Sequence, residues 1–204
     1  MARFVRLGTA VLALCLTATA CSDFVSRESA ADGGPIYAAK GKPVPVDVLQ
    51  RSRPLTKVVT ASAVIGKSGG RIDLPQTGLR VDFPSNALRG NTRITITAVP
   101  GSDVAYTFEP HGLVFSQPVS VRQKFKGTKV DGKKPDYSAL LGVFFNDEAA
   151  LVDGVAPALE IIPTDVEVFK DGIRFKIRHF SGYLVSTGRR SGYISSTGNL
   201  TPAR

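Results

Sequence analysis

The first residue with a clear chemical role is Cys21, whose thiol stands where a bacterial lipoprotein signal places its acyl acceptor. Arg3 and Arg6 supply positive charge, an uncharged apolar run covers residues 7–16, and the small residues 18–20 directly precede the cysteine. This layout predicts export, cleavage before Cys21 and acylation of its thiol with palmitate-type chains that hold the protein on a membrane. The alternative is ordinary secretion with a free Cys21.

The predicted signal peptide therefore comprises residues 1–20. Its apolar run is too short to span a bilayer as a mature helix, so we expect it to be removed, together with Cys15. Leu14 is too bulky for the position before a cleavage site, which favours Cys21 over Cys15. The expected location is the bacterial cell envelope, with the outer membrane or the periplasmic face favoured. The chain has 2 cysteines, so the mature domain would contain no disulfide.

Other residues with catalytic or metal-binding chemistry are few. The 2 histidines, His111 and His179, are far apart in the sequence and form no paired-histidine zinc motif. We expect His111 to be exposed or hydrogen-bonded in a turn at 110–112. The polar segments 131–132 and 146–148 are typical of turns, with a calcium site as the alternative. We expect no enzyme activity, no cofactor and no resident metal.

The charge pattern is basic but dispersed. Loss of Arg3 and Arg6 with the signal would lower the formal net charge from +9 to +7. We interpret this charge as solubilising; the alternative is a passive envelope component that binds anionic lipid or polymer. The pairs 133–134 and 189–190 are isolated and tryptophan is absent, so we expect no nucleic-acid partner.

Composition divides the rest of the chain into three parts. Residues 21–54 are rich in Ser, Gly, Ala and Pro and predict a disordered tether that starts at the lipid. Residues 55–187 have the length of one domain. Residues 188–204 form a predicted disordered tail, in which 191–198 repeats the pattern of 181–188. Alternatively, the repeat 191–198 would add as a strand to an exposed sheet edge of a partner.

The domain is predicted to be all-β, a single β-sandwich. Residues 93–97 alternate polar and apolar, as a half-buried strand does, and 140–145 are apolar on both faces, as a central strand is. Residues 166–170 and 173–178 predict a hairpin closed by a type I′ turn at Asp171-Gly172, with Phe169 opposite Arg174. Gly and Pro recur at the spacing of sandwiches and barrels.

Three segments together resemble the ZU5 family, and they cover residues 63–88, 92–98 and 106–119. In the first, Gly69-Gly70 allows a tight turn and Pro84 ends a strand. In the third, Phe115 stands between chain-breaking residues and is expected to be buried. The resemblance implies a β-sandwich that serves as a binding or scaffolding domain without a cofactor. We expect this domain to stand alone behind a lipid tether, with no second folded module, so the family's partners cannot be carried over.

The resemblance also implies a role for His179-Phe180-Ser181, since self-cleaving relatives break the chain at such a tripeptide. The Ser181 hydroxyl would attack the Phe180 carbonyl with His179 as base, and the peptide would become an ester that water splits. The structural alternative is that Phe180 and Leu184 pack inward while His179 and Ser181 form hydrogen bonds within the sheet. We favour the structural interpretation.

These observations support one leading function and two alternatives. The leading hypothesis is a monomeric lipoprotein, anchored to the membrane at Cys21, which presents a ZU5-like β-sandwich to an envelope protein or glycan. The first alternative is an autoproteolytic domain that cleaves itself between Phe180 and Ser181. The second is the passive basic component.

Overall fold

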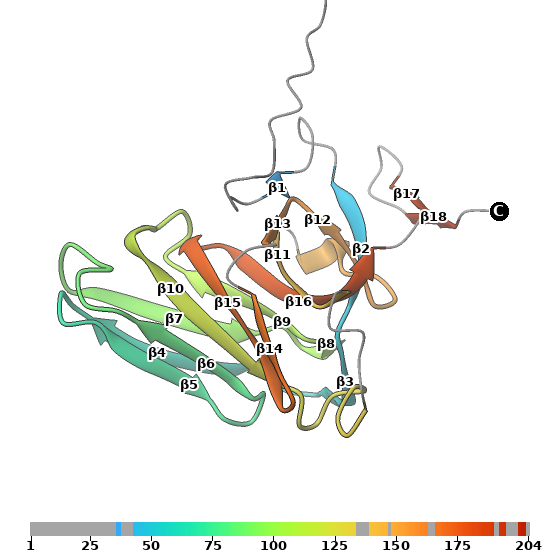
Figure 1. Cartoon of the computed structure of the whole chain (residues 1–204), viewed down its shortest axis with the longest axis horizontal. Coiled ribbons are helices and arrows are strands. Elements are labelled where there is room, and N and C mark those ends of the chain that lie inside the picture. The colour runs from blue at the N-terminus through green and yellow to red at the C-terminus, as the bar shows by residue number, and fades with distance from the viewer. Residues whose placement is uncertain are drawn as a thin grey trace, which may run out of the picture. The chain divides into compact units, whose positions relative to one another are not determined.

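Alternation of apolar and polar residues determines the strands. In β6 (Leu79–Phe83) and β7 (Thr92–Ala98), every second side chain is buried. The structure, a computed structural model, describes residues 36–37, 43–133, 139–146, 148–162, 166–189, 192–194 and 200–202. Over these residues the secondary structure is strand, apart from short 3₁₀ turns such as η3 (Glu148–Ala150), and every strand pair is antiparallel (Figure 1).

In the described part of the chain, one layer of the fold is a nine-stranded sheet. Its main path runs β1-β13-β11-β16-β9-β7-β4, with β2 paired to β16 and β12 paired to β2. Besides β7, its strands are β1 (Ile36–Tyr37), β2 (Val44–Val48), β4 (Val59–Ile65), β9 (Ala105–Glu109), β11 (Leu141–Phe145), β12 (Val155–Ala158), β13 (Glu160–Ile162) and β16 (Gly182–Arg189).

A five-stranded sheet in the order β14-β15-β10-β6-β5 provides the other layer. Besides β6, it contains β5 (Gly70–Leu74), β10 (Val114–Lys124), β14 (Glu167–Phe169) and β15 (Gly172–His179). Apolar side chains from the facing sides of both sheets, such as Val121 of β10 and Ile96 of β7, form one continuous core. Two layers around a shared core make the fold a β-sandwich, so the predicted fold class is confirmed.

A second, smaller apolar cluster lies on the other face of the nine-stranded sheet. Val46 of β2, Val143 of β11 and Leu184 of β16 are buried in it. Tyr183 and Val185, which alternate with Leu184 along β16, belong to the main core, so β16 is buried on both faces. The prediction that 140–145 form a central strand is confirmed, because β11 lies between β13 and β16.

The structure confirms the predicted tight turn at Gly69, the strand end at Pro84 and the burial of Phe115. Gly69 has a φ of 76°, and a Cβ there would lie 2.2 Å from the carbonyl oxygen of Phe83. Pro84 follows the last residue of β6, and Phe115 is buried with its ring centroid 6.2 Å from that of Phe83.

Described strands lie outside the predicted domain boundaries at both ends. Residues 44–54, expected in the tether, form β2 and most of β3 (Gln50–Leu55), which pairs with β8 (Gly101–Asp103). No sign of β2 was visible in the sequence, because a proline such as Pro45 argues against a central strand. In the structure, Pro45 of β2 pairs with Pro157 of β12. At the other end, β16 extends to Arg189, and β17 (Gly192–Ile194) pairs with β18 (Leu200–Pro202), where we predicted a disordered tail.

The predicted hairpin exists, but its register is shifted by two residues. Glu167 pairs with Arg174 and Phe169 with Gly172, so Lys170 and Asp171 make the turn. Gly172 does not have a positive φ; a Cβ there would lie 2.5 Å from the carbonyl oxygen of Gln123 in β10. The glycine is therefore explained by close approach to the neighbouring strand rather than by a type I′ turn.

A buried polar contact joins the two sheets inside the core. The Tyr106 hydroxyl of β9 donates to Oε1 of Gln123 in β10 at 2.7 Å, and Gln123 Nε2 donates to the Thr77 carbonyl oxygen at 2.8 Å. Burial raises the pKa of the Tyr106 phenol above its ordinary value, because the phenolate would lose its hydration. The contact therefore needs the neutral phenol.

Replacement of Gly69 by alanine should lower the free energy of unfolding by about 2 kcal/mol or more, because strain at positive φ adds to a backbone clash. Gly127→Ala is the matched control, since Gly127 also has a positive φ, 81°, but no atom within 4 Å of a Cβ. Urea unfolding should give a loss of about 1 kcal/mol for this control. Equal losses in the two variants would contradict the role of the close approach.

Tyr106→Phe should change how stability depends on pH. The folded-state pKa of Tyr106 is raised, so its contribution is complete below pH about 10 and is lost as the pH rises further. The variant should be less stable at neutral pH by about 1–2 kcal/mol, since Gln123 loses a partner. Above pH about 10 its free energy of unfolding should fall less steeply than that of the wild type. Parallel curves would show that Tyr106 does not titrate in this way.

Candidate functional site

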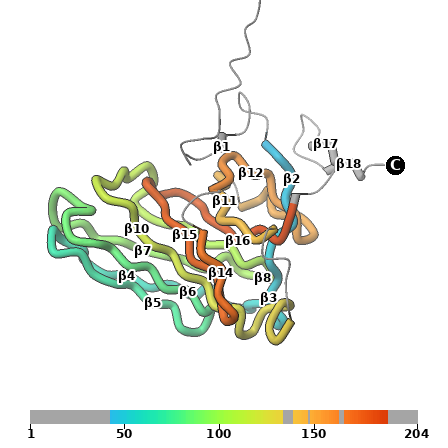
Figure 2. Tube along the Cα trace, viewed as in Figure 1, coloured from blue at the N-terminus to red at the C-terminus, as the bar shows by residue number. Residues whose placement is uncertain are grey.

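The tripeptide His179-Phe180-Ser181 lies where the chain crosses from the five-stranded sheet to the nine-stranded sheet, between β15 and β16 (Figure 2). Phe180 is 1% exposed at this crossing. Its ring centroid lies 4.7 Å from that of Phe115 and 5.1 Å from that of Phe108, which belong to different sheets. The side chain therefore contacts both layers at the point where the chain passes between them.

Backbone hydrogen bonds hold Phe180 and Ser181 on both sides of the peptide bond that joins them. The Phe180 N–H donates to the Leu113 carbonyl at 2.8 Å, and the Gly112 N–H donates to the Phe180 carbonyl at 3.0 Å. The Ser181 carbonyl accepts from the Phe108 N–H at 3.0 Å. The carbonyl that Ser181 would attack thus already faces one N–H donor.

The imidazole of His179 is held by two other side chains. Its Nε2 lies 3.0 Å from Oε2 of Glu160 in β13, and its Nδ1 lies 3.2 Å from the Tyr183 hydroxyl. The same hydroxyl donates to the His179 carbonyl at 2.7 Å. Among the described residues no hydrogen bond links His179 to the Ser181 hydroxyl, so this geometry fits the structural interpretation, with Phe180 and Leu184 both buried.

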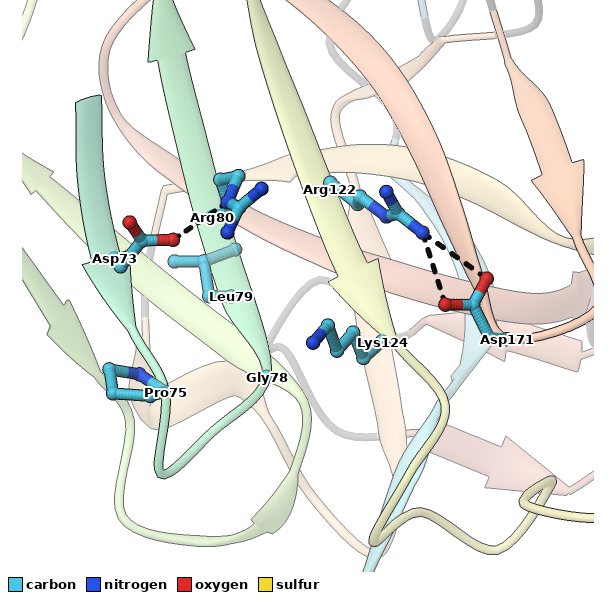
Figure 3. A pocket seen from close by; sticks show the side chains of 8 residues that line it. All are labelled: Asp73, Pro75, Gly78, Leu79, Arg80, Arg122, Lys124 and Asp171. Atoms are coloured by element: carbon cyan, nitrogen blue, oxygen red, sulfur yellow. Dashed lines mark hydrogen bonds and ion pairs between the residues drawn. The ribbon is translucent and has the colours of Figure 1, made fainter. Parts of the chain in front are cut away.

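A second candidate is a groove of about 470 Å³ on the outer face of the five-stranded sheet, at the end nearest the β14–β15 turn. Three cations and two carboxylates line it (Figure 3). The lining residues are Asp73, Pro75, Gly78, Leu79, Arg80, Arg122, Lys124 and Asp171.

Ion pairs fix two of these cations. Arg80 Nε lies 2.8 Å from Oδ1 of Asp73, and Arg122 Nη2 lies 3.1 Å from Oδ2 of Asp171. The contact with Asp73 raises the pKa of the Arg80 guanidinium further above its ordinary value. Lys124 reaches from β10 toward β6, and its ammonium makes no ion pair with a described residue (Figure 3).

The sequence did not reveal this groove, although part of its signal was visible. Charged residues alternate with apolar ones in β6, β10 and β15, and this pattern predicts one solvent-exposed face on each strand. Only the register of β10 with its two neighbours brings Arg80, Arg122 and Arg174 side by side.

The remaining sequence candidates lie elsewhere. Cys21 and Asp147 are outside the described residues. His111 is exposed, as expected, and Asp131 accepts a hydrogen bond from the Gly127 N–H at 3.0 Å, as turn residues do. Within the described part of the chain, no three His, Cys, Asp or Glu side chains gather as a metal-binding group.

Comparison of the chain with protein-family models gives no match, and comparison with the sequences of curated proteins gives none either. In the portion that the structure describes, none of the helices has the length and apolar character needed to cross a bilayer.

Replacement of Phe180 by alanine should destabilise the domain by about 3–5 kcal/mol, because it leaves a cavity between the sheets. Phe180→Leu keeps most of the volume and should cost less than about 1.5 kcal/mol. Ser181→Ala, the control, should change the free energy of unfolding by less than about 0.5 kcal/mol. The ranking is read from denaturant midpoints, and a Ser181→Ala loss as large as that of Phe180→Ala would contradict it.

Proposed function

We propose that this chain is an exported lipoprotein, attached to a membrane of the bacterial envelope through Cys21, which presents its β-sandwich as a binding module. The observation that carries the binding role is the charged groove between β6 and β10. Its cations and carboxylates lie on a solvent-facing sheet surface that contributes nothing to the apolar core. The partner is an envelope glycan or protein, and the domain acts by non-covalent binding.

The kinship with ZU5 domains is part of this proposal. The segments that carry the resemblance form the Gly69 turn, β6 up to Pro84, β7, and the strands around the buried Phe115. These are features that a ZU5-like sandwich would need. In such domains they support a surface for partners rather than a reaction centre.

Attachment at Cys21 can be tested by metabolic labelling with an alkyne analogue of palmitate. The wild type should be labelled and should sediment with membranes, whereas Cys21→Ala should lose the label, because acylation needs its thiol. Cys15→Ala is the matched control and should be labelled as strongly as the wild type. Equal labelling of Cys21→Ala and the wild type would refute the anchor.

Autoproteolysis is the second candidate, and the Gly112 N–H at 3.0 Å from the Phe180 carbonyl oxygen is the observation that favours it. That donor would stabilise the oxyanion formed when Ser181 Oγ attacks the Phe180 carbonyl carbon. The Phe180–Ser181 C–N bond would break, and His179 would pass the hydroxyl proton to the Ser181 amine. Water would then split the ester into the Phe180 carboxylate and the Ser181 hydroxyl.

A denaturing gel distinguishes the two candidates. A binding module should give one intact band after prolonged incubation, identical to that of Ser181→Ala. A self-cleaving domain should give a fragment ending at Phe180, which mass spectrometry would identify, and Ser181→Ala should abolish it.

A further inference from the structure

Three arginines lie directly opposite one another on adjacent strands of the five-stranded sheet. Arg122 of β10 pairs with Arg80 of β6 on one side and with Arg174 of β15 on the other. Side chains so paired have Cβ atoms about 5 Å apart, and like charges at this spacing destabilise a sheet. The row therefore costs stability, and an anion placed over it would reduce the repulsion.

Three carboxylates balance the formal charge of this row but use only some of its N–H donors. Asp73 and Glu167 stand at its two ends, next to Arg80 and Arg174, while Asp171 reaches Arg122 from the turn. Each of these contacts uses a single guanidinium nitrogen of its arginine. The Nε of Arg122 is buried and has no hydrogen-bond partner. The guanidinium nitrogens that make no ion pair, other than this buried Nε, therefore remain as donors for a ligand.

An aromatic ring holds part of the row in place. The guanidinium carbon of Arg122 lies 5.4 Å from the ring centroid of Phe169, and that of Arg174 lies 5.0 Å from it. Cation–π contacts of this kind restrict both side chains, so less conformational entropy is lost when an anion binds.

The charge balance of the groove points to one class of anion. Arg80, Arg122 and Lys124 outweigh Asp73 and Asp171 by one positive charge at neutral pH. A group with a single negative charge matches this balance, and hydroxyls beside it would donate to the two carboxylates. A dianionic phosphate would meet repulsion from the same carboxylates. A carboxylate on a sugar ring satisfies both conditions.

We propose that this groove binds a uronic-acid unit of an acidic polysaccharide, with the carboxylate over Lys124 and the free donors of Arg80 and Arg122. Arg178 adds a further exposed cation on the same face, since it alternates with the buried Ile177 of β15. The inference rests on the proposed binding function and names its ligand.

The test is titration of the full chain, purified in a neutral detergent, with oligogalacturonate. The wild type should bind, and binding should weaken with added salt, because the contacts are charged. The methyl-esterified oligomer, the same sugar without charge, should bind at least about tenfold more weakly. Equal binding of the two oligomers, or no binding of either, would overturn the inference.

Two variants locate the site. Lys124→Gln removes no ion pair with a described residue and should weaken binding about tenfold, as loss of a charged hydrogen bond does. Arg93→Gln removes an exposed cation from β7 in the other sheet and should change the affinity less than about twofold. Equal losses would mean that net charge alone attracts the polymer and would refute the groove.

Vesicles of phosphatidylglycerol test the alternative that the groove binds an anionic lipid surface. If they bind the wild type in a Lys124-dependent way and the oligogalacturonate does not bind, the face recognises a lipid surface and the glycan inference is wrong. Failure of both probes overturns the groove inference alone, because acylation of Cys21 and membrane sedimentation test the anchor separately.

Discussion

The passage of the chain between its two sheets is the constraint on which the rest of the structure depends. At this point the backbone leaves β15, and its polar groups must find partners inside the molecule. The loop at 112–113 supplies them, since it accepts from the Phe180 N–H and donates to the Phe180 carbonyl. The ring of Phe180 meanwhile packs against rings of both layers. The crossing and the loop therefore stabilise each other.

This crossing also determines the outer surface. Because Ile177 and Phe175 of β15 are buried below it, the residues between and beyond them must face solvent. The same alternation in β10 buries Val121 and Gln123 and turns Arg122 outward. A one-residue slip would bury the arginines, so the core selects the register that aligns Arg80, Arg122 and Arg174. The row of like charges is thus a consequence of the packing beneath it.

The sequence predicts what is local and misses what depends on register. Alternation identified β7, and the apolar run at 140–145 identified a central strand, because these signals lie within one segment. The hairpin at 166–178 was predicted with the wrong pairing, since Gly172 is required by the neighbouring β10 and not by the turn. Pro45 concealed β2, whose Val46 is buried in a cluster with residues distant in the sequence. The groove combines three strands, and no single segment encodes it.

The positions of the carboxylates on the five-stranded sheet explain where its uncompensated positive charge lies. Asp73 and Glu167 belong to the edge strands β5 and β14, so each can reach only the arginine beside it. Arg122, in the centre, depends on Asp171, which the shifted turn places next to it. Two residue pairs further along, Lys124 pairs with Gly172, which has no side chain to offer. Positive charge is therefore left uncompensated beside the turn, because the close approach that requires a glycine there also excludes an acidic partner.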